Sequence, residues 1–130
     1  MKPTTLRLAL VCYGILFAGI ILAADRGHVW HFVTDLPLGD KLGHLGLVGT
    51  LSLLLNLTLR GRRAPRPFSG IMLGTLLVAT GMTLEETSQA FFPSRTLDLF
   101  DGLANLAGAA VGELIARFLL RRRTGAAVAG

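Results

Sequence analysis

The sequence is poor in charged residues and nearly free of cysteine. Of its 130 residues, 16% are charged and 52% are hydrophobic. A soluble domain carries roughly 25% charged residues, so this scarcity argues against an ordinary soluble domain. It argues equally against a disordered chain, which needs high charge and low hydrophobicity. The single cysteine, Cys12, excludes a scaffold of internal disulfides.

Long apolar runs account for most of the hydrophobic residues. They are Leu8–Ala24, Leu42–Leu59, Phe68–Leu84 and Gly102–Leu120. A transmembrane helix needs about 20 mostly apolar residues, and each run approaches that length. The runs are continuous rather than alternating, which favours helices over strands. We therefore predict an all-α polytopic membrane protein, a single domain over residues 1–130 that forms an antiparallel bundle of four transmembrane helices.

The first run has a competing interpretation as a cleaved signal peptide. Lys2 and Arg7 would form its basic start. The apolar run of 17 residues is longer than the usual core of about 7–15 residues, and Leu22-Ala23-Ala24 is a poor cleavage site. We therefore expect a retained helix.

Charged residues divide sharply between the two ends of the expected helices. Ten of the thirteen basic residues fall at one end, namely Lys2, Arg7, Arg60, Arg62, Arg63, Arg66, Arg117, Arg121, Arg122 and Arg123. Because basic residues mark the cytoplasmic side, both termini and the loop 60–67 are expected inside the cell. Seven of the eight acids and all three histidines fall at the other, outer end. The formal charge of +5 is thus a topology signal, and no nucleic-acid partner is expected.

Polar residues enter the outer ends of the last three runs. The set is Asp40, Lys41, His44, Glu86, Gln89, Arg95, Asp98, Asp101 and Asn105. Helix capping explains one acid at each start but not the whole set. Polar groups near the hydrocarbon are costly and tend to be functional. We expect the three helix ends to form an outward-opening, ligand-binding pocket, in which Lys41 and Arg95 balance the carboxylates and meet anionic groups of a ligand.

Small and charged residues deeper in the fourth run have simpler explanations. Gly108 and Gly112 lie on the same stripe as the polar residues that precede them, and such a pair lets a neighbouring helix approach closely. Glu113 and Arg117 are four residues apart, in the order that favours a local ion pair.

The order of these polar residues resembles that of the VanZ-like family of small bacterial membrane proteins. The resemblance is carried by Asp40-Lys41-x-x-His44, by Glu86-x-x-Gln89 with Phe92-Pro93 and Arg95, and by Asp98, Asp101, Asn105, Gly108 and Gly112. It spans about residues 40–112. It implies a multi-pass protein of the bacterial cytoplasmic membrane that belongs to the cell envelope. The named member of the family is linked to resistance to the glycopeptide antibiotic teicoplanin.

Three functions compete for the expected pocket. The first is binding of a lipid-linked cell-wall head group among the membrane lipids. The second is an enzyme acting on such a head group, with His44, Glu86 and Asp101 as catalytic candidates. A transporter is disfavoured because most polar residues stop near the outer third of the bilayer. No metal or cofactor is assigned, because His28-x-x-His31 is a common spacing and zinc needs three or four fixed ligands.

Overall fold

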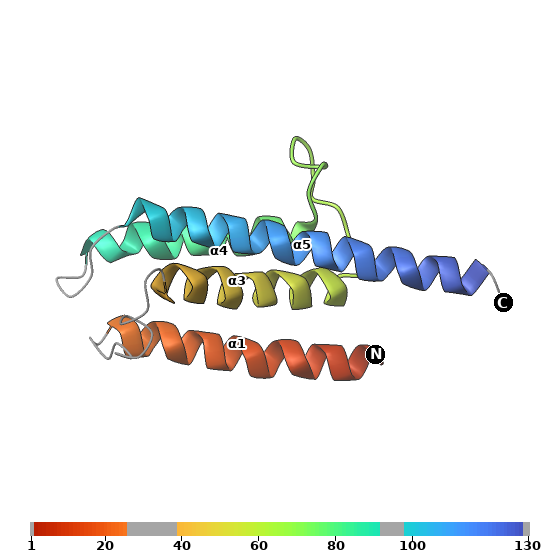
Figure 1. The fold of residues 1–130 in the computed structure, drawn as a ribbon, viewed down its shortest axis with the longest axis horizontal. Coiled ribbons are helices and arrows are strands. Elements are labelled where there is room, and N and C mark those ends of the chain that lie inside the picture. The colour runs from red at the N-terminus through yellow and green to blue at the C-terminus, as the bar shows by residue number, and fades with distance from the viewer. Residues whose placement is uncertain (1, 26–38, 92–97, 129–130) are drawn as a thin grey trace.

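A computed structural model describes residues 2–25, 39–91 and 98–128 of the chain. Within these ranges the fold is all-helical and has no strand (Figure 1). The elements are α1 (Pro3–Asp25), α3 (Gly39–Thr58), α4 (Leu73–Ser88), the short 3-10 turn η1 (Gln89–Phe91) and α5 (Leu99–Val128). The prediction of an all-α fold is confirmed.

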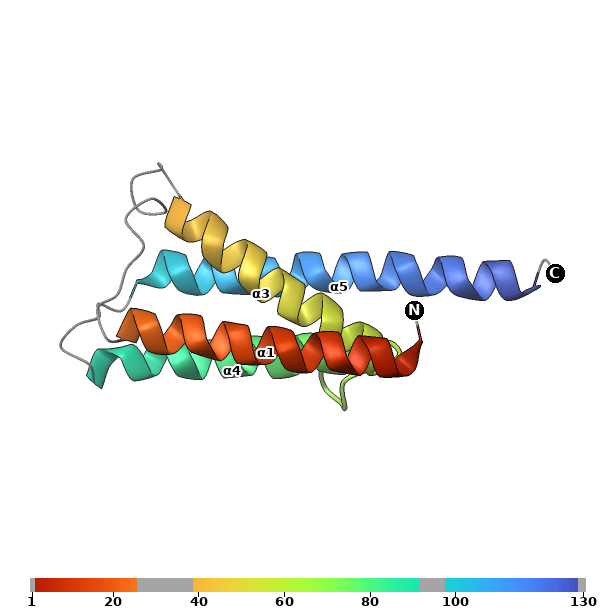
Figure 2. The same ribbon diagram turned by 90° about the horizontal axis from the view of Figure 1, so that it is seen from below.

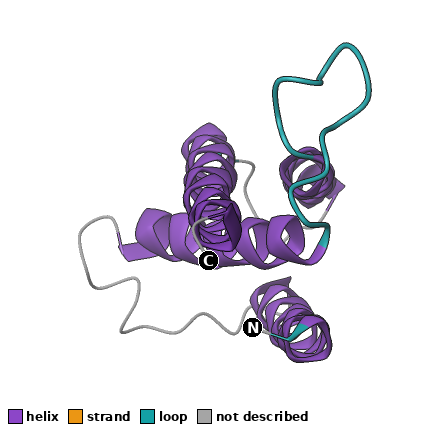
Figure 3. Cartoon of the chain, turned by 90° about the vertical axis from the view of Figure 1, so that its right-hand side faces the viewer, coloured by secondary structure: helices purple, strands orange, loops and turns teal. Residues whose placement is uncertain are grey.

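Helix α3 is the centre of the arrangement. Consecutive α-helices run in opposite directions, and α3 lies between α1 and the pair α4 and α5 (Figure 1). It packs against each of the other three, whereas α1 packs against α3 alone among the described elements. Figure 2 shows that α3 crosses α5 obliquely. The view along the bundle shows the loop between α3 and α4 standing away from the helices (Figure 3).

Two of the described helices are long and apolar enough to cross a membrane. They are α1 over Pro3–Ala24 and α5 over Leu99–Arg122. Both expose large apolar side chains, such as Ile15, which is 69% exposed, and Leu114, which is 65% exposed. Helix α4 has 16 residues and is about 24 Å long at 1.5 Å per residue. By length and composition, two of the four expected spans are therefore seen as candidates.

The third helix begins later than the sequence predicts. We expected it from Phe68, but α4 begins at Leu73. Residues 59–72 instead form a folded loop, whose first turn uses the positive φ of 70° at Gly61. The Gly61 N–H donates to Asn56 O at 2.9 Å, which closes the end of α3. Leu73 N donates to Arg62 O at 2.8 Å, so the loop returns to its own start before α4 begins.

Close backbone contact joins α3 to α5. A Cβ added at Gly108 would lie 2.5 Å from Leu45 O, and one added at Gly112 would lie 2.9 Å from Leu53 N. Neither position has room for a side chain. Gly49 of α3 faces Gly108 from the other side, because its own added Cβ would lie 3.1 Å from Gly108 O. Around this contact, apolar residues from four helices form one core cluster: Phe17, Val48, Val78, Met82 and Ala109.

Candidate functional site

Lys41 lies at the centre of a polar cluster where α3 and α5 begin. Its Nζ donates to Asp101 Oδ1 at 2.5 Å and to Asp98 Oδ2 at 2.8 Å. A third carboxylate oxygen, Asp40 Oδ2, lies 3.5 Å from the same nitrogen. Helix α3 begins at Gly39, so Asp40 lies in its first turn and is not the residue that precedes the helix. The lysine therefore joins the start of α3 to the start of α5 through Asp98 and Asp101.

The Asp98 carboxylate both caps α5 and accepts a hydrogen bond from Lys41. Its Oδ1 accepts from the N–H of Phe100 at 2.8 Å, which caps the start of α5. Its other carboxylate oxygen accepts from Lys41, and this hydrogen bond is the main cause of a lowered Asp98 pKa. The hydrogen bonds to Asp101 and then Asp98 raise the pKa of Lys41. Asp98 and Lys41 are therefore charged at neutral pH.

His44 lies one turn along α3 and faces two carboxylates. Its Nδ1 is 2.9 Å from Asn105 Oδ1. Its Nε2 is 3.7 Å from Asp40 Oδ1 and 3.8 Å from Asp101 Oδ2, beyond hydrogen-bond distance. Asp40 and Asp101 thus each direct one oxygen toward Lys41 and the other toward His44.

The end of α4 joins the cluster through Glu86. Its Oε1 accepts from the N–H of Asp98 at 3.2 Å, and burial raises its pKa. Gln89 Nε2 lies beside it, 3.4 Å from Glu86 Oε2, and donates more closely to Glu85 Oε1 at 3.0 Å. Glu86 and Gln89 are both buried. The contact of Glu85 with Gln89 was not predicted, because the sequence analysis paired Gln89 with Glu86, three residues away.

The structure brings together all the predicted pocket residues that it describes. These are Asp40, Lys41, His44, Glu86, Gln89, Asp98, Asp101 and Asn105. Arg95 lies outside the described residues, as do Phe92-Pro93, His28 and His31. Capping accounts for Asp98, whereas Asp101 and Asn105 face Lys41 and His44.

A second polar group lies at the opposite end of α3. Asn56 Nδ2 donates to Thr75 Oγ1 at 2.8 Å and lies 3.3 Å from Ser52 Oγ. Ser52 in turn donates to the carbonyl of Ala109 at 2.9 Å. All three side chains are buried. Sequence analysis did not predict this group, because serine and threonine are ordinary residues within apolar helices.

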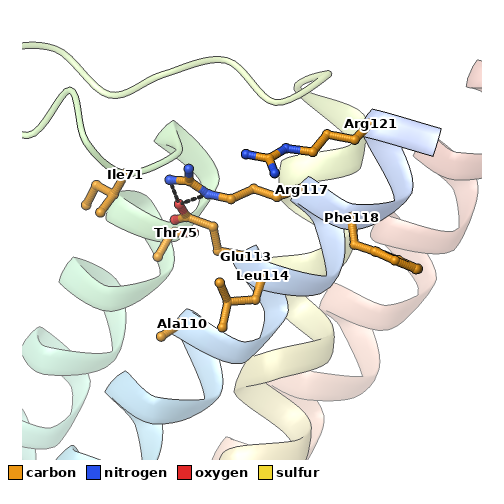
Figure 4. Close-up of a pocket in the computed structure, with 8 residues that line it drawn as sticks. All are labelled: Ile71, Thr75, Ala110, Glu113, Leu114, Arg117, Phe118 and Arg121. Carbon is orange, nitrogen blue, oxygen red and sulfur yellow. Dashed lines mark hydrogen bonds and ion pairs between the residues drawn. The ribbon is translucent and has the colours of Figure 1, made fainter. Parts of the chain in front are cut away.

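Glu113 and Arg117 form the expected ion pair. Arg117 Nε donates to Glu113 Oε1 at 2.7 Å, as Figure 4 shows. The pair also reaches the loop before α4, because Glu113 Oε2 accepts from the N–H of Met72 at 3.0 Å and Arg117 Nη2 donates to Gly70 O at 2.7 Å. It therefore fastens the start of α4 to α5. A surface pocket of about 510 Å³ lies beside it, lined by Ile71, Thr75, Ala110, Glu113, Leu114, Arg117, Phe118 and Arg121.

The Lys41 cluster has an excess of negative charge. Three aspartates surround one lysine, and Glu86 adds a fourth carboxylate. Among the described residues, one donor atom each from Asp40, His44 and Asp101 lie within 4.8 Å of one another, a spacing that can hold a metal ion. The cluster can therefore accept hydrogen bonds or hold a cation.

Over the described residues, the fold is all-helical, two helices are long and apolar enough to cross a membrane, and an ionic cluster joins three helix ends. The chain matches no protein-family model, no curated protein and no solved structure.

Proposed function

We propose that this is a VanZ-like integral membrane protein of the bacterial cell envelope that binds a polar head group in the Lys41 cluster. In this proposal all four α-helices cross the cytoplasmic membrane and both termini are in the cytoplasm. The cluster then lies at the outer face. The single observation that carries the proposal is the convergence of α3, α4 and α5 on Lys41 and its carboxylates.

The exposed apolar surface supports the membrane setting. Large hydrophobic side chains are exposed on α4 as well as on the two candidate spans, with Leu77 at 52% and Leu84 at 67%. A monomer in water rarely exposes contiguous apolar surface beyond a few hundred Å². Lipid would cover these side chains on all sides of the bundle.

The charge distribution supports the orientation. The loop between α3 and α4 carries Arg60, Arg62, Arg63 and Arg66 at the end opposite to the Lys41 cluster. Basic loops stay in the cytoplasm. The acidic helix ends then face outward, where lipid-linked cell-wall intermediates present their head groups.

The hydrogen bonds already made within the Lys41 cluster limit which chemical groups of a ligand it can bind. Lys41 is already engaged by carboxylates, so we do not assign it the anionic partner expected from the sequence. Asp40 and Asp101 instead offer acceptor oxygens, which suit the hydroxyl, amide and amino groups of a sugar or peptide head group. The competing proposal is an enzyme, in which His44 acts as general base beside Asp101.

Identification of bound lipid tests this proposal. The protein would be purified in mild detergent and its co-purifying lipids identified by mass spectrometry, alongside Asp101→Asn and His44→Gln. Thr83→Val is the matched control, because Thr83 is exposed and its hydroxyl donates to a carbonyl of its own helix, Ala79 O. We expect a lipid-linked head group on the wild type and the control but not on the two cluster variants. The same lipids on all four proteins would contradict the proposal, and turnover of the lipid by wild type alone would favour the enzyme.

A further inference from the structure

From the geometry around His44 we infer a divalent transition-metal site, formed by His44 Nε2, Asp40 Oδ1 and Asp101 Oδ2. These three atoms belong to α3 and α5, and no function is required of the bound ion for the inference to hold. The inference therefore does not rest on head-group binding, although both proposals use Asp40, His44 and Asp101.

The imidazole of His44 is oriented with Nδ1 toward Asn105 and Nε2 toward the two carboxylates. Asn105 Oδ1 lies 2.9 Å from His44 Nδ1 and accepts its hydrogen. The other ring nitrogen, Nε2, faces one oxygen of Asp40 and one of Asp101, and its lone pair is available to a metal ion in the tautomer with hydrogen on Nδ1. Three electron-rich atoms facing one another repel unless a positive charge lies between them. Metal-binding histidines are held in this way, with the second nitrogen bonded to a fixed acceptor.

The distances from His44 Nε2 to the two carboxylate oxygens also suit a metal ion. Zinc binds histidine nitrogen and carboxylate oxygen at about 2.0–2.2 Å in tetrahedral sites, which places neighbouring donors about 3.4 Å apart. The observed 3.7 and 3.8 Å are too long for hydrogen bonds but need only a small inward movement to meet that spacing. A nitrogen ligand with two carboxylates suits Zn²⁺ better than Mg²⁺ or Ca²⁺, which prefer oxygen alone.

The excess of carboxylates and the buried amide of Asn105 also favour a bound cation. Lys41 balances only one of the three aspartates around it, and Glu86 adds a fourth carboxylate to the cluster, so a divalent cation would reduce the excess of negative charge. Asn105 is 2% exposed, and its Nδ2 has no hydrogen-bond partner among the described residues. A buried donor calls for an acceptor. A water or ligand oxygen in the fourth coordination position would supply one.

Zinc titration of metal-free protein in detergent tests the inference. Binding would be followed by calorimetry, with Co²⁺ as a coloured substitute that reports tetrahedral coordination. We expect one site per chain in the wild type and at least about a 100-fold loss of affinity in His44→Gln and in Asp101→Asn. Asn105→Leu should weaken binding by about 10–100-fold, as for other residues that orient a ligand.

Asp98→Asn is the matched control. It also removes one carboxylate charge beside Lys41, but Asp98 does not face His44, and asparagine preserves the cap on α5. Its zinc affinity should stay within a few-fold of wild type, and Lys41→Met should bind zinc more tightly because a competing cation is removed. Thermal unfolding without metal would show that each variant is folded.

Two results would overturn the inference. The first is a wild-type protein that binds no zinc at millimolar concentration. The second is zinc binding that is equally tight in His44→Gln or Asp101→Asn, which would place the metal elsewhere.

Discussion

Lys41 Nζ lies 2.5 Å from Asp101 Oδ1, although the two residues are 60 positions apart in the chain. The bond connects the first turn of α3 to the first turn of α5. The side chains of Lys41 and Asp101 are 29% and 16% exposed, so water competes with the pair only in part. This pair joins the two helices whose backbones approach closely at Gly49, Gly108 and Gly112.

A double-mutant cycle should detect this pair. We expect Lys41→Met and Asp101→Asn each to destabilise the fold, and the double variant to be more stable than the sum of the two effects predicts. The coupling should be on the order of 1 kcal/mol, as for contacting residues in one ionic network. Thermal unfolding in detergent measures it. Strictly additive effects would show that the pair does not contribute.

The ionic network should also depend on pH. The pKa of Asp98 is lowered, so the stability that it contributes is full above its unfolded value of about 3.9 and is lost as pH falls through the folded value. The pKa of Lys41 is raised, so its contribution is full below about 10.4 and is lost only at higher pH.

The difference in melting temperature between wild type and Lys41→Met measures this dependence. It should be constant from about pH 5 to pH 9 and should shrink below about pH 4, where the carboxylates take up protons. A difference that stays unchanged at pH 3 would show that the lysine acts through packing and not through charge.

Glycine substitutions should separate the α3–α5 contact from ordinary helix surface. A Cβ at Gly108 meets backbone at 2.5 Å, so Gly108→Ala should destabilise the protein by about 1–3 kcal/mol. At Gly81 of α4, nothing lies within 4 Å of an added Cβ. Gly81→Ala should therefore be neutral or stabilising by up to about 1 kcal/mol, through helix propensity alone. Equal melting temperatures for the two variants would contradict the close approach.

The buried group around Asn56 should contribute to stability independently. Thr75→Val removes the oxygen 2.8 Å from Asn56 Nδ2 and should cost about 0.6–1.7 kcal/mol, the range for polar contacts between membrane helices. Thr83→Val makes the same chemical change at an exposed position of the same helix. It should leave unfolding within about 0.5 kcal/mol of wild type. Loss of stability in both variants alike would point to helix propensity as the cause.

The Lys41 cluster was predictable because helix periodicity is local. Steps of three or four residues placed Asp98, Asp101 and Asn105 on one face, and the structure directs that face toward α3. Which partner each side chain meets depends on how helices cross, and spacing along one helix carries no such information. This is why the contact of Gly49 with Gly108 was not foreseen.

The helix limits were less predictable than the helices. Phe68 belongs to an apolar run, yet it lies in the loop, where its N–H donates to Pro65 O at 2.9 Å. The apolar run includes residues that lie in a turn, so its hydrophobic pattern begins before the helix does. Similarly, Ser52 and Thr75 lie in apolar runs, and only the crossing of α3 and α4 shows that they meet.

The central claim is that the Lys41 cluster lies outside the cell, at the end of the bundle opposite to the arginine-rich loop. Two single-cysteine proteins, made in a Cys12→Ser background, would test it in intact cells with a membrane-impermeant maleimide. Phe91→Cys marks the cluster end and Arg66→Cys marks the loop, and both positions are exposed.

We expect the maleimide to label Phe91→Cys in intact cells and to label Arg66→Cys only after the membrane is permeabilised. Labelling of both from the same side, or of Arg66→Cys alone from outside, would contradict the account.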